Sequence, residues 1–100
     1  MKQLPGTYKI NEEQFSLEVT NYVSPTGPVA LQVWGNHGPE CRLTVNLPDL
    51  MILLKKNQIF VKGDQIKYTT PHLEAIGFVN TGETVPYGNY DSIAEIWELS

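Results

Sequence analysis

The sequence predicts an α+β domain in which most of the chain forms an antiparallel sheet. Between residues 15 and 47, apolar and polar side chains alternate in three successive runs. Successive side chains on a strand point to opposite faces, so this alternation is typical of half-buried strands. Short turns rich in glycine and proline separate the runs, as in a meander. With one helix start, at Thr70-Pro71, we expect about five or six strands and one short helix over residues 71–76.

The chain has the size and composition of one globular domain, residues 1–100. It is 41% hydrophobic and 18% charged, which argues against disorder. No apolar run approaches the roughly 18 residues of a membrane-spanning helix, and the first six residues lack the apolar core of a signal peptide. We therefore expect a cytoplasmic protein without a membrane partner.

Four strands are expected in the first half of the chain, over residues 7–11, 15–23, 29–34 and 41–47. The first two form a hairpin. The fourth alternates without a break up to Pro48, and we expect it to be the central strand, with the single cysteine, Cys41, as a small buried hydrophobe. Tyr22 and Trp34 fall on the outward face. They are either an exposed contact surface or core residues covered by the helix and residues 50–54.

The pattern changes after Pro48. Residues 50–54 are apolar without alternation, which fits either a short helical turn started by Pro48 or a loop that caps the sheet. Residues 58–62 read as a short strand. Thr70 is expected to cap the helix, with Pro71 at its first position and Gly77 ending it in a left-handed conformation.

The C-terminal segment is ambiguous between a strand and a helix. A short extended piece is expected over residues 78–82 and a loop over residues 86–91. Ser92 and Glu95 could form a capping box that opens a helix. A strand over residues 93–99 would place Glu95 among apolar side chains. We favour the strand, because so short a helix is marginal and the segment is rich in β-branched and aromatic residues.

No pattern in the sequence indicates catalysis, a metal site or a cofactor. His37 and Cys41 are four residues apart and His72 is distant, whereas zinc sites usually have four ligands in paired short spacings. A nucleophilic cysteine needs exposure beside an imidazole, and we expect Cys41 to face inward. The glycines are scattered through turns rather than gathered in a phosphate-binding loop. We therefore expect neither an enzyme nor a protein with a small-molecule substrate.

Charge is unevenly distributed along this chain of net charge -4. Four lysines lie between Lys55 and Lys67, while residues 74–100 carry five acids and no base. An acidic chain is a poor nucleic-acid binder, so binding through the segment from Lys55 to Lys67 is only an alternative. We expect the acidic end to engage a basic protein surface. The expected partner-binding residues are Glu83, Tyr87, Tyr90, Asp91, Glu95, Trp97 and Glu98.

Several segments together resemble a known family. They are the run Leu43-Thr44-Val45-Asn46-Leu47-Pro48, the run Ile59-Phe60-Val61-Lys62, the helix end Ile76-Gly77, the pair Thr81-Gly82 and the terminal Glu98-Leu99. The first two are the most specific. Over residues 15–99 the chain resembles a family of small uncharacterised single-domain proteins, a "domain of unknown function" group, from phages, plasmids and other mobile elements of gut bacteria. It departs from the family pattern at residues 50–56 and 86–92.

The resemblance implies a function without assigning catalytic residues. Small acidic proteins of mobile elements often inhibit host defences, so the resemblance implies an anti-CRISPR protein, an inhibitor that binds a host CRISPR-Cas effector stoichiometrically. The alternative is a non-inhibitory structural or scaffold module of a mobile element, homodimeric through a free sheet edge.

Overall fold

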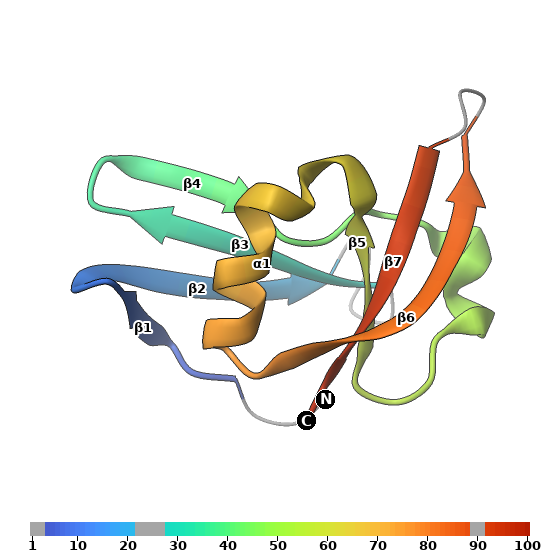
Figure 1. Cartoon of the computed structure of the whole chain (residues 1–100), viewed down its shortest axis with the longest axis horizontal. Coiled ribbons are helices and arrows are strands. Elements are labelled where there is room, and N and C mark those ends of the chain that lie inside the picture. Colours follow the sequence, from blue (N-terminus) through green and yellow to red (C-terminus); the bar gives the residue numbers. More distant parts are fainter. Residues whose placement is uncertain (1–3, 22–27, 89–91) are drawn as a thin grey trace.

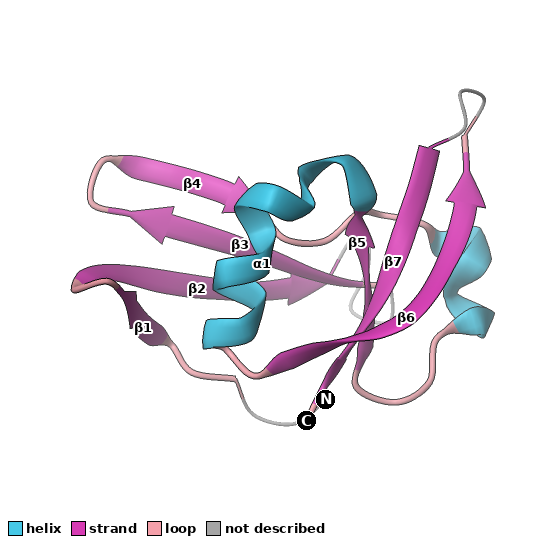
Figure 2. Cartoon of the chain, in the orientation of Figure 1, coloured by secondary structure: helices cyan, strands magenta, loops and turns pink. Residues whose placement is uncertain are grey.

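The computed structural model describes residues 4–21, 28–88 and 92–100. Within them, seven strands form two antiparallel sheets, accompanied by one α-helix and two 3₁₀ helices (Figure 1). This confirms the predicted α+β class. The strands number seven rather than five or six, and they are divided between sheets of four and three strands (Figure 2).

The first sheet is the predicted meander, with the strand order β1-β2-β3-β4. Its strands are β1 (Thr7–Ile10), β2 (Glu13–Asn21), β3 (Val29–Gly35) and β4 (Gly38–Arg42). The β1–β2 hairpin is confirmed, and its tight turn places Asn11 and Glu12 at positive φ angles of 50° and 71°. Such angles suit a two-residue hairpin turn whose twist matches that of the strands.

The second sheet is built around the C-terminal strand. Its members are β5 (Gln58–Lys62), β6 (Phe78–Tyr87) and β7 (Ser92–Leu99), in the order β5-β7-β6. The strand prediction for residues 93–99 is therefore confirmed. The Glu95 carboxylate accepts hydrogen bonds from the Trp97 indole N–H (3.0 Å) and the Asn80 amide (3.2 Å), which explains how an acid is tolerated on that side of the strand.

The prediction that residues 41–47 form the central strand of a sheet is wrong. β4 ends at Arg42, and the following residues cross from the first sheet to the second. The Leu43 N–H donates to the Leu31 carbonyl at 2.9 Å, and the Val45 N–H donates to the Phe60 carbonyl at 3.1 Å. Leu43 packs in one hydrophobic cluster and Val45 in another. The apolar alternation thus belongs to a connection between two clusters.

Helix α1 (Ile66–Ala75) begins earlier than predicted, directly after the 3₁₀ turn η2 (Gly63–Gln65). Thr70 is therefore not its N-cap, and Pro71 lies inside the helix. The helix extends to Ile66 because Thr69, His72 and Leu73 form one buried stripe at helical spacing, and tertiary packing outweighs local propensity. Glu74 consequently lies in the last turn.

The remaining predictions are confirmed in part. Residues after Pro48 form the 3₁₀ helix η1 (Pro48–Leu53), so the helical-turn interpretation holds. Gly77 follows α1 at a φ angle of 102°, as predicted. β6 continues to Tyr87 through a bulge between Asn80 and Thr84, so the expected loop over residues 86–91 is shorter, and residues 89–91 lie outside the described ranges.

The larger hydrophobic cluster joins both sheets to α1. It includes Phe15, Val33, Leu73, Phe78 and Trp97. Phe60, Ala94 and Ile96 form a smaller cluster on the opposite face of the second sheet, beneath the residues around η1. Outside these clusters, Trp34 lies on the outer face of β3 and is 38% exposed, so its interpretation as a core residue is wrong. Tyr22 lies outside the described residues.

Gly63 allows the start of α1 to approach β7 closely. A Cβ atom at this position would lie 2.7 Å from the Ile93 carbonyl oxygen, a backbone atom that cannot move independently.

The substitution Gly63→Ala should therefore lower the free energy of unfolding by about 1–3 kcal/mol. Urea unfolding measures this effect. Gly6→Ala is the matched control, because nothing lies within 4 Å of its added Cβ atom, and equal midpoints for the two variants would contradict the packing described.

Candidate functional site

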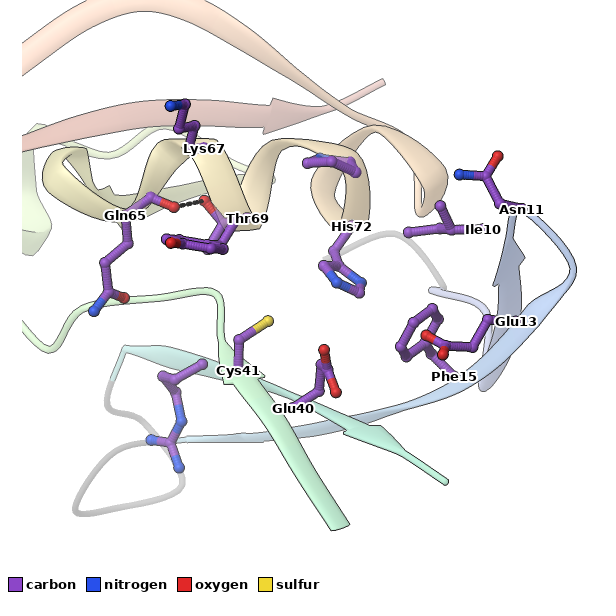
Figure 3. Close-up of a pocket in the computed structure, with 13 residues that line it drawn as sticks. Ile10, Asn11, Glu13, Phe15, Glu40, Cys41, Gln65, Lys67, Thr69 and His72 are labelled. Atoms are coloured by element: carbon purple, nitrogen blue, oxygen red, sulfur yellow. Dashed lines mark hydrogen bonds between the residues drawn. The ribbon is translucent and has the colours of Figure 1, made fainter. Parts of the chain in front are cut away.

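An open groove of about 860 Å³ lies between α1 and the first sheet (Figure 3). Its walls come from the β1–β2 hairpin, from β4 and from one side of α1. Glu13, Glu40, Cys41 and His72 line it, and Figure 3 shows their side chains gathered around one space. The groove thus brings together residues that are far apart in the sequence.

A β-bulge in β4 positions Glu40. Val33 pairs with Cys41 while the next residue, Trp34, pairs with Pro39, so Glu40 is the extra residue of the hairpin. Bulges of this kind redirect a side chain, and Glu40 lines the groove together with its neighbour Cys41. The Glu40 carboxylate lies over Gly35, where an added Cβ atom would be 3.1 Å from its Oε2 atom.

His72 is held at the groove by two aromatic rings. It is only 7% exposed, and the Tyr8 hydroxyl lies 2.7 Å from its Nδ1 atom in a hydrogen bond. The Phe15 ring meets the imidazole edge-to-face at 4.8 Å between ring centres, and Tyr8 stacks on Phe15 at 5.6 Å. Such aromatic contacts favour a fixed ring orientation. The β1–β2 hairpin therefore fixes the orientation of a histidine that α1 supplies.

Burial and the nearby carboxylates control the titration of this cluster. Burial lowers the pKa of His72, although the charges of Glu40 and Glu13 act in the opposite direction. Burial also raises the pKa of Tyr8, with smaller contributions from Cys41 and Glu40. The pKa of Cys41 is raised to about 11, first by burial and then by Glu40. Near pH 7 the imidazole, the phenol and the thiol are therefore mainly neutral.

The arrangement is better suited to binding than to nucleophilic catalysis. A cysteine nucleophile requires an accessible thiolate, which a lowered pKa supplies. Cys41 is half-buried, has a raised pKa, and no hydrogen bond joins it to His72 in the described part of the chain. The described residues contain no group of three or more His, Cys, Asp or Glu side chains placed to hold a metal ion.

Two carboxylates that line the groove are not neutralised by an ion pair within the described ranges. The carboxylates of Glu13 and Glu40 have no hydrogen-bond or ion-pair partner among the described residues. Lys67 also lines the groove, but Figure 3 shows its ammonium group on the far side of α1. Arg42 also lines the groove, and its Nε donates to the Gln32 side chain at 3.0 Å.

The structure brings together only some of the predicted partner-binding residues. Tyr87 and Glu95 line a second pocket, and the Glu95 carboxylate accepts a hydrogen bond from the Trp97 indole. Trp97 belongs to the core at 4% exposed, and Tyr87 packs against the smaller hydrophobic cluster. Glu95 and Glu98 are three positions apart on a regular strand, so they point to opposite faces of β7. Glu83 is exposed on the bulged part of β6. Tyr90 and Asp91 lie outside the described residues.

Sequence analysis missed His72, Tyr8, Glu13 and Glu40 as a group. His37, the histidine considered with Cys41, is exposed in the β3–β4 turn and does not line the groove. Tyr8 and Phe15 are partners across the β1–β2 hairpin, so the predicted hairpin was the one signal that could have indicated their contact. No local signal in the sequence reveals the bulge at Glu40 or the place of α1 above the sheet.

Comparisons with known proteins supply no relative. No protein-family model matches the chain, and neither the curated proteins nor the solved structures include a significant match. The residue roles proposed below therefore rest on geometry and charge. Within the described ranges, no helix has the length and apolar character needed to cross a membrane.

The raised pKa of Cys41 predicts slow alkylation of the folded protein. A shift from 9.0 to about 11 lowers the thiolate fraction near pH 7.5 about 100-fold. Mass spectrometry after iodoacetamide treatment should show much slower modification of Cys41 in buffer than in urea. Glu40→Gln should accelerate the reaction in buffer only, because it removes a charge that opposes the thiolate. An unchanged rate in that variant would refute the electrostatic role of Glu40.

The lowered pKa of His72 predicts a loss of stability on mild acidification. Because the folded-state pKa lies below the ordinary 6.5, the unfolded chain binds this proton first as the pH falls. The free energy of unfolding should therefore decrease as the pH drops through 6.5 toward the folded-state value. Urea unfolding of wild type and His72→Gln at pH 7.5 and 5.5 measures this contribution. A decrease of the same size in both proteins would exclude His72 as its source.

Proposed function

We propose that the chain acts by stoichiometric binding of another protein in the bacterial cytoplasm. The groove between α1 and the first sheet receives a basic segment of the partner. One observation carries this proposal: the unpaired carboxylates of Glu13 and Glu40 face the groove, while the Lys67 ammonium group lies on the far side of α1 and the Arg42 Nε donates to Gln32. A cationic group that enters the groove thus meets two acids that no base among the described residues holds in an ion pair.

Charge favours this mode of association at two scales. The net charge of -4 attracts a basic partner at long range, and the groove provides a defined place for the contact. The acids of the C-terminal third add to the long-range attraction. However, Glu95 and Glu98 lie on opposite faces of β7, so they do not form a single docking surface. The groove is therefore the better candidate for the specific contact.

The resemblance to proteins of mobile elements supports a class of partner. Inhibitors of host defence bind effectors that handle nucleic acid, and such effectors carry basic channels. A Cas effector is accordingly the proposed partner, and the chain would occupy part of its basic channel.

A pull-down tests the proposed binding and its location. The tagged chain is incubated with bacterial lysate to which a panel of purified Cas effectors has been added. The double variant Glu13→Lys, Glu40→Lys should lose the effector that the wild type retains. The matched control Glu83→Lys, Glu98→Lys changes the net charge equally at two other exposed acids, and it should retain that effector. Circular dichroism establishes that both variants are folded.

The other outcomes contradict the proposal in different ways. Equal loss in both variants would indicate non-specific attraction, and loss in the control alone would locate the contact on the second sheet. Retention of no effector, together with a salt-insensitive homodimer in light scattering, would favour the scaffold module instead.

A further inference from the structure

His72 presents an unpaired nitrogen to the groove. Its side chain is more than nine-tenths buried, and Tyr8 engages the Nδ1 atom. No hydrogen bond of Nε2 is found among the described residues, and none of their buried side-chain nitrogen or oxygen atoms lacks a partner. Nε2 must therefore be accessible from the groove, into which Figure 3 shows the ring pointing. A buried imidazole with one accessible nitrogen is an unfilled hydrogen-bonding position.

The side chains around Nε2 define the chemistry of a ligand group that would form a hydrogen bond with this atom. Glu40 approaches from β4 and Glu13 from β2, and both charges act on His72. The Phe15 ring forms an apolar wall against the imidazole. A complementary group must carry positive charge, donate several hydrogen bonds and tolerate contact with a ring. The guanidinium group meets all three requirements, because it is planar, weakly hydrated and carries five N–H donors.

We infer that this end of the groove is a binding site for one arginine side chain of the partner, an inference that rests on the proposed function. The guanidinium donates two hydrogen bonds to the Glu40 carboxylate, a bidentate arrangement that ammonium groups cannot reproduce. It also donates to the neutral His72 at Nε2, while Nδ1–H donates to the Tyr8 oxygen. Glu13 supplies the second negative charge, and the arginine methylenes contact Phe15.

Binding should depend on the position of the Glu40 carboxylate as well as its charge. Gly35 leaves the space that the carboxylate occupies, because a Cβ atom there would lie 3.1 Å from Oε2. Gly35→Ala displaces the carboxylate and retains every charge, so it should weaken arginine binding. Glu40→Gln removes the charge and should weaken binding further.

An NMR titration with N-acetyl-arginine amide tests the site directly. The probes for comparison are N-acetyl-lysine amide and N-acetyl-citrulline amide, the second of which is a neutral isostere. The arginine amide should shift the resonances of His72, Tyr8 and Glu40 and bind at least about tenfold more tightly than either probe. Glu40→Gln should lower its affinity by a similar factor. Glu18→Gln, an exposed acid on the outer face of β2, should leave it unchanged.

The imidazole nitrogen resonances provide a second readout. With arginine bound, the His72 proton should lie on Nδ1, because Nε2 must then accept a hydrogen bond. Equal affinity for the lysine or citrulline amide, shifts confined to other residues, or no effect of Glu40→Gln would overturn the inference. If the arginine site fails while effector capture still requires Glu13 and Glu40, the proposed function stands and only the guanidinium assignment is lost.

Discussion

The burial of β7 on both faces is the constraint on which the rest of the structure depends. Trp97 and Leu99 pack into the larger cluster, and Ala94 and Ile96 pack into the smaller one. A strand with two apolar faces needs a cover on each side. The first sheet and α1 supply one cover, and the segment from Val45 to Leu54 contributes to the other. The crossing between the two sheets and the position of α1 follow from this requirement.

The groove exists because α1 and the first sheet meet at one end only. Leu73 and Ile76 anchor the helix in the core, whereas the hairpin ends of the sheet extend beyond it (Figure 1). His72 lies at the boundary, where it packs against Phe15 and lines the groove. The same aromatic packing that closes the core therefore also places a polar nitrogen at its edge. Stability and the candidate site share these contacts.

Structural features that depend on a few neighbouring residues were predicted well. Arrangements that depend on contacts between residues far apart in the sequence were not. Alternation located β1, β2 and β3 closely, and a short apolar run located β5, because each of these strands has an apolar side chain facing the core. The same signal failed at Leu43 and Val45, where a connection between two clusters also alternates. The Thr70-Pro71 signal failed because residues before it are buried in the helix. The groove needed the bulge at Glu40 and the packing of α1, which local sequence does not encode.

The bulge in β6 has a consequence for how the protein behaves in a crowded cell. β6 is an edge strand of ten residues, and a straight edge of that length would offer a template on which other chains could add strand by strand. Gly82 at a φ angle of 84° bends the edge, and Pro86 removes one of its N–H groups. Glu83, exposed between them, adds charge repulsion between like edges. The distortion therefore disfavours edge-to-edge pairing of β6 with other chains.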